Sequence, residues 1–197
     1  MPASSSAMSR RVTFVATAVL VGLLALVGCG GDEDDASGHN DADVAFAQEM
    51  IPHHAQAVQM VRMTQDKVLD PKVAELAEGM AAAQEDEIAQ MAEWLEEWGE
   101  DVPDSTMQDM GHHADPHAEN MPGMMTEEQM GELAVATGPG FQTMWLEMMI
   151  EHHEGAIESA RTQQEEGRYG PAVELAQEIE RSQTEEIAQM EELLQQS

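Results

Sequence analysis

The sequence predicts an all-α protein, a four-helix bundle made of two αα-hairpins with a long crossover between them. No segment shows the alternation of a β-strand, whereas apolar residues recur at helical spacing in both halves of the chain. The stretch Phe46–Val61 (FAQEMIPHHAQAVQMV) recurs 99 residues later as Trp145–Ala160 (WLEMMIEHHEGAIESA). Residues 87–91 and 186–190 both have the sequence EIAQM at the same offset. These matches indicate two copies of one helical unit.

Residues 1–28 are predicted to be an export signal that is not part of the fold. Arg10 and Arg11 precede the apolar run Val12–Val27, which is short for a membrane span. The run ends in LVGC, which resembles the lipobox of bacterial lipoproteins. That resemblance implies that Cys29 is lipidated and anchors the chain to the cell membrane on its extracytoplasmic side. An ordinary signal peptide with a chance cysteine is the alternative.

Cysteine content and charge limit the chemistry of the protein. Cys29 is the only cysteine, so no disulfide can form within the chain and no thiolate is left to bind a metal. The net charge of -31 disfavours nucleic acid as a partner and favours cations, although most of the acidic residues are expected on solvated helix faces. No nucleophile–base arrangement, phosphate-binding loop or nucleotide motif is present, so we expect a protein that is not an enzyme.

The first hairpin is predicted within residues 41–99, after an acidic, flexible tether at 29–40. Its first helix should run from Asp41 or Asp43 to Asp66. Its second helix should run over residues 71–98, because Asp70 can cap it, Pro71 suits its first turn and Gly99 can end it.

The segment 100–140 is predicted to be the crossover, because it is rich in Gly, Pro, Met and His. A capping box at Thr126 predicts a short helix over about 127–136. The second hairpin, within residues 141–197, should contain helices over about 141–166 and 171–194. A crossover of this length can run along the whole bundle, as in ferritin-like folds. One domain over residues 41–197 is expected.

Helical phase places both His-His pairs on inward faces of their helices. Counting from the first hairpin turn puts His53 level with Gln84 and Met50 level with Glu87, and the second hairpin repeats this pattern. If a twofold axis relates the hairpins, both sets meet near the middle of the bundle, as one site or two adjoining ones. The residues expected there are Met50, His53, His54, Gln84, Glu87, Met149, His152, His153, Gln183 and Glu186. A purely structural polar layer is the alternative.

Thioether and imidazole groups favour soft or borderline metal ions, with Cu(I) first. The crossover adds further candidate ligands of the same kinds, unless it is only a Met-rich loop or flap. These are Met107, Met110, His112, His113, His117, Met121, Met124 and Met125. A di-iron bundle needs Glu-x-x-His on two helices, but Met stands three residues before His53 and His152. Iron is therefore the less favoured alternative, and zinc would leave the many methionines without a role.

The doubled motif Met-Ile-x-His-His-x-x-Ala, with Gln-x-x-Glu-Ile on each partner helix, resembles the domain-of-unknown-function family 305 over residues 41–194. The resemblance implies an exported or lipid-anchored bacterial protein with a ferritin-like bundle, and copper binding and resistance in some members. It also implies that the Met and His residues of the two motifs are the characteristic positions.

The sequence therefore predicts an extracytoplasmic, lipid-anchored metal-binding protein. Its ion would be Cu(I), with Ag(I) or Cu(II) also open, and its role copper buffering, delivery or resistance. A ferritin-like metal-dependent oxidase and a structural or interaction lipoprotein are the alternatives. No protein partner is indicated, and a homo-oligomer is left open.

Overall fold

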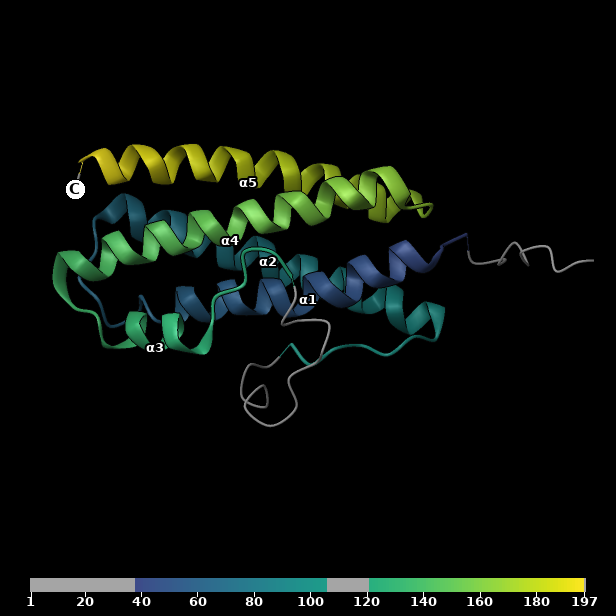
Figure 1. Ribbon diagram of the computed structural model, residues 1–197, viewed down its shortest axis with the longest axis horizontal. Helices are drawn as coiled ribbons and strands as arrows, with labels where there is room; N and C mark the ends of the chain where they lie inside the picture. The colour runs from purple at the N-terminus through teal and green to yellow at the C-terminus, as the bar shows by residue number, and fades with distance from the viewer. Residues whose placement is uncertain (1–37, 106–120, 197) are drawn as a thin grey trace, which may run out of the picture. The chain divides into compact units, whose positions relative to one another are not determined.

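The computed structural model describes residues 38–105 and 121–196, and within these ranges the chain forms helices and no strand (Figure 1). The all-α prediction is therefore confirmed. The helices are α1 (Asp41–Arg62), α2 (Pro71–Trp98), α3 (Glu127–Val135), α4 (Gly138–Glu166) and α5 (Gly170–Gln196). The predicted signal segment, with Cys29, lies outside the described residues.

Hydrogen bonds from nearby residues mark both ends of helix α1. At the start of α1 a capping box joins Asn40 and Asp43, and each side chain accepts a hydrogen bond from the other residue's backbone N–H. Helix α1 ends at Arg62, four residues before the predicted Asp66. The Thr64 hydroxyl and amide both donate to the carbonyl of Val61, and this local bonding competes with another helical turn.

Two of the later helix ends follow the predicted signals, and a third differs from the prediction. Gly99 ends α2 with a left-handed φ of 76°. The predicted capping box between Thr126 and Gln129 is present at the start of α3. Helix α4 begins at Gly138, three residues earlier than predicted, with Pro139 in its first turn.

The helices pack so that α1 contacts α2 and α4, and α4 contacts α5, whereas α2 and α5 meet at few residues. The buried apolar side chains form two clusters. The Trp145 cluster includes Ala57, Met60, Met80, Phe141, Trp145, Met149 and Met190. The Met50 cluster includes Phe46, Met50, Ile51, Met91, Ala156 and Ile179. Along α1 and along α4, the His-His pair lies between residues of the two clusters.

Each hairpin turn is held by a side chain of the other hairpin. The buried carboxylate of Asp43 accepts hydrogen bonds from the backbone amides of Arg168 and Tyr169 in the α4–α5 turn. Gln142, which lies 99 residues after Asp43, accepts a hydrogen bond from the amide of Asp70 in the α1–α2 turn. These contacts fix the register of the two hairpins, and so the height at which their histidines meet.

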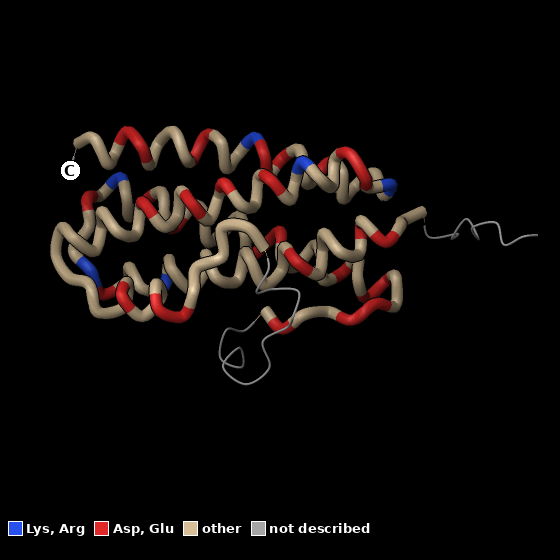
Figure 2. Tube along the Cα trace, in the orientation of Figure 1, with Lys and Arg blue, Asp and Glu red and all other residues tan. Residues whose placement is uncertain are grey.

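Acidic residues are spread along the long helices, and basic ones are few (Figure 2). Ion pairs such as Arg161–Glu180, at 2.8 Å, are solvent-exposed on at least one side. Such pairs contribute about 0–1 kcal/mol each, so the apolar core and not the charged surface holds the fold together. Within residues 38–105 and 121–196, no helix is long and apolar enough to cross a membrane.

Candidate metal centre

The two His-His pairs meet in the interior of the bundle. His53 and His54 of α1 are 0% exposed, and His152 and His153 of α4 are 1% and 0% exposed. The ring centroids of His53 and His152 are 3.7 Å apart, and the rings are tilted by 39°. Each of these two rings lies farther from its neighbour on the same helix, at 6.3 Å in α1 and 6.4 Å in α4. The centre is therefore a close pair of imidazoles with one further imidazole beside each.

The two flanking histidines are each held by a glutamate of the partner helix. His54 Nε2 lies 2.6 Å from Glu87 Oε2, and His153 Nε2 lies 2.8 Å from Glu186 Oε2. An ionised carboxylate only accepts hydrogen bonds, so in a neutral ring Nε2 carries the proton and donates it. The glutamates therefore direct the Nδ1 lone pairs of both rings away from themselves. This is the usual role of a carboxylate behind a metal-binding histidine.

The two central histidines are held by backbone groups instead. His53 Nε2 lies 3.3 Å from the carbonyl oxygen of Pro122, so a neutral His53 donates from Nε2 and keeps its lone pair on Nδ1. His152 makes its hydrogen bond to the backbone of His53, and its Nε2 has no partner among the described residues. The two rings therefore present different nitrogens, although they occupy matching positions in the two motifs.

Burial keeps both central rings neutral. Loss of hydration lowers the pKa of His53 well below its usual value, and the nearby His54 and His153 lower it further. The pKa of His152 is also lowered, first by burial and then by His53, His153 and His54. A neutral imidazole has the free lone pair that a metal ion requires, so both rings are in their metal-binding form at neutral pH.

Several buried polar atoms in this layer have no hydrogen-bond partner among the described residues. They are His53 Nδ1, His54 Nδ1, His152 Nε2, His153 Nδ1, Gln84 Oε1 and Gln183 Oε1. Leaving such a group unsatisfied costs about 1–3 kcal/mol. One nitrogen on every ring, together with two amide oxygens, can therefore donate a lone pair. A metal ion accepts several lone pairs at once, so these atoms suit it as ligands.

The arrangement also limits which metal it could hold. In the described part of the chain, no three side chains of the His, Cys, Asp and Glu types are grouped closely enough to hold a metal ion. A metal held here would need sulfur or amide donors, or a rotation of the rings. Hard ions prefer oxygen ligands, whereas Cu(I) and Ag(I) accept imidazole and thioether donors. The residues present therefore fit a soft ion better than a hard one.

The two methionines of the motifs lie on opposite sides of the histidine layer. Met50 and Met149 are both 0% exposed, but Met50 belongs to the cluster named after it and Met149 to the Trp145 cluster. Counting from the turn places Met50 at the height of Glu87, yet Glu87 bonds to His54, one turn away. The reason is that Cα–Cβ bonds tilt toward the N-terminus of each helix, so antiparallel side chains approach each other across about one turn.

A segment of the crossover, which we call the strap (Met121–Met125), lies directly over the central histidines. Gln56 of α1 clamps it with two buried hydrogen bonds, because its Nε2 donates to the carbonyl of Met125 at 2.9 Å and its Oε1 accepts from the amide of Met125 at 2.7 Å. On α4, a side chain at Gly155 would overlap the Pro122 carbonyl. Gly155 lies 99 residues after Gln56, so one helix clamps the strap where the other makes room for it.

Sequence reasoning missed Gln56, Pro122 and Gly155. The available signals were a Gln on an apolar helix face and a Gly inside a long helix, which often marks a close approach of two backbones. Of the predicted ligands in the crossover, Met121 and Met125 are buried in the two apolar clusters, and Met124 is partly buried against the Met50 cluster. Met107, Met110, His112, His113 and His117 lie outside the described residues.

Comparison with known proteins gives consistent structural matches. A DUF305 protein from Streptomyces coelicolor, described as secreted, is 33% identical with a TM-score of 0.69 over 79% of this chain and 93% of its own. A DUF305 fragment from Deinococcus radiodurans is 25% identical with a TM-score of 0.69 over 80% and 98%. CopM in its Cu(I)-bound form is 28% identical with a TM-score of 0.63 over 78% and 96%. CopM has also been solved in Cu(II)-bound and Ag-bound forms.

A comparison with curated protein sequences gives no match. The family profile of DUF305, a domain of unknown function, matches residues 43–194. That range covers all five helices except for the ends of the first and the last. It also contains both histidine pairs and the strap. The family resemblance noted in the sequence is thereby confirmed, and this chain belongs to the DUF305 family.

Proposed function

We propose that this chain binds copper, with a preference for Cu(I), and buffers it or passes it on outside the cytoplasm. The observation that carries the proposal is the layer of buried histidines in which every ring keeps one nitrogen without a partner. Neutral imidazole is a ligand that copper accepts, and Cu(I) also accepts the thioethers of the motifs. The likeness to CopM, which has been solved with Cu(I), Cu(II) and Ag, supports the same class of ion.

In this proposal His53 and His152 are the central ligands, and His54 and His153 are the flanking ones. Met50 and Met149 supply sulfur from either side of the layer. Glu87 and Glu186 act as positioning residues, because their carboxylates are already engaged with the histidine Nε2 atoms. In the crossover, Met107, Met110, His112, His113 and His117 would capture ions or hand them over.

The proposed location rests on the N-terminal sequence. We infer that residues 1–28 direct export and that Cys29 carries the lipid, because Cys29 follows the lipobox-like LVG at the end of the apolar run. A relative described as secreted supports an extracytoplasmic location. The net charge of -31 would concentrate cations around a domain held at the cell surface.

We also propose binding rather than catalysis. Oxidase chemistry at a di-iron site needs carboxylates that are free to bind the metal. Glu87 and Glu186 instead hold their histidines at 2.6 and 2.8 Å. Met50 and Met149 stand where a di-iron bundle would have further glutamates.

A Cu(I) competition titration against bathocuproine disulfonate tests the proposal on the chain from residue 37 onward. The titration compares this protein with a variant in which His53, His54, His152 and His153 are replaced by Ala. We expect this variant to lose the tightly bound Cu(I). The control is His39→Ala, which removes a histidine that stacks on Trp98 and is not part of the layer, and it should bind Cu(I) as the parent protein does.

The fourfold variant changes the core, so its fold is checked by circular dichroism. The milder pair His53→Gln and His152→Gln keeps a polar side chain at each central position. Unchanged Cu(I) affinity in folded forms of both variants would show that the bundle does not hold the ion.

A further inference from the structure

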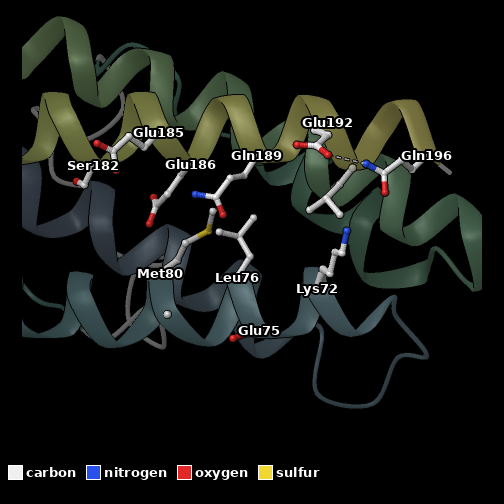
Figure 3. Close-up of a pocket in the computed structure, with 12 residues that line it drawn as sticks. Lys72, Glu75, Leu76, Met80, Ser182, Glu185, Glu186, Gln189, Glu192 and Gln196 are labelled. Carbon is white, nitrogen blue, oxygen red and sulfur yellow. Dashed lines mark hydrogen bonds between the residues drawn. The ribbon is translucent and has the colours of Figure 1, made fainter.

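A groove between α2 and α5 opens to solvent and is lined by Glu186, whose carboxylate bonds to a histidine of the buried layer. Its cavity has a volume of about 550 Å³, and it exists because these two helices meet at few residues. Figure 3 shows Glu186 and Gln189 of α5 pointing toward α2, where Leu76 and Met80 lie opposite them. Met80 is itself part of the buried core, so the floor of the groove is the edge of the bundle interior.

Glu186 connects this groove with a buried imidazole. Its side chain is 20% exposed and lines the groove, while its Oε2 lies 2.8 Å from Nε2 of the fully buried His153. A single carboxylate therefore separates the groove from the ring. Rotation of that side chain would leave the Nε2 edge of the ring facing the groove.

On the opposite face the strap covers the layer, and a smaller pocket of about 320 Å³ lies beside it, lined among others by Met121, Pro122 and Glu158. There the strap runs over His53 between α1 and α4, with the Pro122 carbonyl 3.3 Å from His53 Nε2. Gln56 clamps the strap, and Gly155 lets it approach α4 directly. From this pocket, Pro122 of the strap covers the His53 ring.

From these observations we infer that metal ions reach the histidine layer through the α2–α5 groove, past Glu186. This inference rests on the proposed copper-binding function. The lining of the groove suits a soft cation, because Glu75, Glu185 and Glu192 surround it and the Met80 side chain lies at its floor. Lys72 is the one basic residue among those that line it.

The lining of the groove includes a glycine that the second repeat lacks. Gly79 lines it, and a Cβ added there would meet no atom within 4 Å. The position 99 residues later is Glu178, and the counterpart of Leu193 in the first repeat is the much larger Trp94. We therefore expect a larger side chain at Gly79 to occupy part of the groove without disturbing the backbone, which makes this position suitable for a test.

The test compares Gly79→Leu with a matched control, Gly131→Leu, in the full chain. Gly131 is also an exposed helical glycine with open space around it, but it lies in α3, away from the groove. Stopped-flow absorbance follows release of bound Cu(I) to bathocuproine disulfonate and its uptake from that complex. We expect Gly79→Leu to slow both by about tenfold and leave the affinity unchanged, because a blocked route raises the barrier in both directions. Gly131→Leu should behave as the parent protein.

A second readout uses the metal-free protein. Diethyl pyrocarbonate modifies accessible neutral imidazoles, and peptide mass spectrometry reports which histidines have reacted. We expect Gly79→Leu to protect His153, while the modification of the partly buried His39, which stacks on Trp98, stays unchanged. Parent-like exchange rates and parent-like modification of His153 in Gly79→Leu would overturn the proposed route. If the parent protein binds no Cu(I), the proposed function fails, and protection of His153 still decides whether the groove leads to the layer.

Discussion

His53 and His152 lie ring to ring, and each hydrogen bond they make goes to a backbone group of the chain. This arrangement gives the two rings different free nitrogens, Nδ1 on His53 and Nε2 on His152. Sequence reasoning placed both residues inward, because helical phase is a local property. It could not assign the free nitrogen, since that depends on Pro122, which lies 69 residues from His53.

The stability of the metal-free protein should fall as the pH drops below about 6.5, the ordinary pKa of histidine. Burial lowers the pKa of His53 and His152 in the folded state, so the unfolded chain binds more protons than the folded one in this range. The stability that comes from keeping these two rings neutral is therefore fully present above the pKa of the unfolded chain, and it is lost as the pH falls toward the lower pKa of the folded state. Each histidine contributes a slope of up to about 1.4 kcal/mol per pH unit. Urea unfolding between pH 7.5 and 5.5, with a chelator present, measures it.

The control for this pH dependence is the double variant His53→Gln and His152→Gln. Removing the two depressed groups should flatten the curve between pH 7.5 and 5.5. The remaining dependence would come from the other titrating groups. The same slope in the parent and the variant would mean that these two rings do not govern acid sensitivity.

The strap is the element that distinguishes the two halves of the bundle. The motif predicts similar surroundings for both His-His pairs, and the contacts His54–Glu87 and His153–Glu186 do match in their atoms and sequence separation. The match fails at Gln56 and Gly155, where the strap is bound. Helix ends with local signals, such as Thr126 and Gly99, were predictable because a few neighbouring residues decide them. The path of the crossover was not, because distant residues decide it.

The substitution Gly155→Ala should destabilise the protein, although Ala favours helix over Gly. The added Cβ would overlap the Pro122 carbonyl, and relief requires displacing the strap from α4. We expect a loss of about 1–3 kcal/mol, as for other overpacked sites, measured by urea unfolding. Hydrogen exchange at the Met125 amide, which Gln56 Oε1 binds, should speed up in parallel.

Gly79→Ala and Gly131→Ala are matched controls for this substitution. Both glycines are helical, and a Cβ at either position meets no atom within 4 Å. Each control should stabilise the protein by about 0.5–1 kcal/mol, because Ala has the higher helix propensity. A similar stabilisation by Gly155→Ala would mean that the strap is not tightly seated on α4.

The acidic residues repel one another across the whole folded protein. The net charge is -31, and the acidic residues are spread along all the long helices (Figure 2). Repulsion among them opposes the compact state, and salt screens it. The exposed pairs formed by the few basic residues offset little of this repulsion. A bundle with this surface must be held together by its two apolar clusters and by the contacts that lock its turns.

Raising the ionic strength from about 10 mM to 200 mM should therefore raise the melting temperature, because the Debye length falls from about 30 Å to less than 10 Å. A gain of about 1 kcal/mol corresponds to about 2–4 °C for a chain of this size. Differential scanning calorimetry of the metal-free protein measures the change. Sodium chloride and sodium sulfate at equal ionic strength should act alike if screening is the cause. A melting temperature that does not respond to either salt would contradict the argument.

The sequence was sufficient for the helices, for their inward faces and for the family. Helical periodicity, caps and the doubled motif are patterns in the sequence itself, so they can be recognised without the tertiary structure. They placed the histidines, glutamines and motif methionines in the interior, where the structure has them buried. They also singled out Glu87 and Glu186 on the facing helices, because the motif repeats there at the same spacing.

Only the tertiary structure decided how these residues meet. It brought His53 against His152, gave each glutamate to a flanking histidine, laid the strap over one face and left the α2–α5 groove open on the other. The physical reason is that each of these features joins segments far apart in the chain. Their geometry depends on side-chain direction, hairpin register and the volume of single residues such as Gly79 and Gly155, none of which a local pattern encodes.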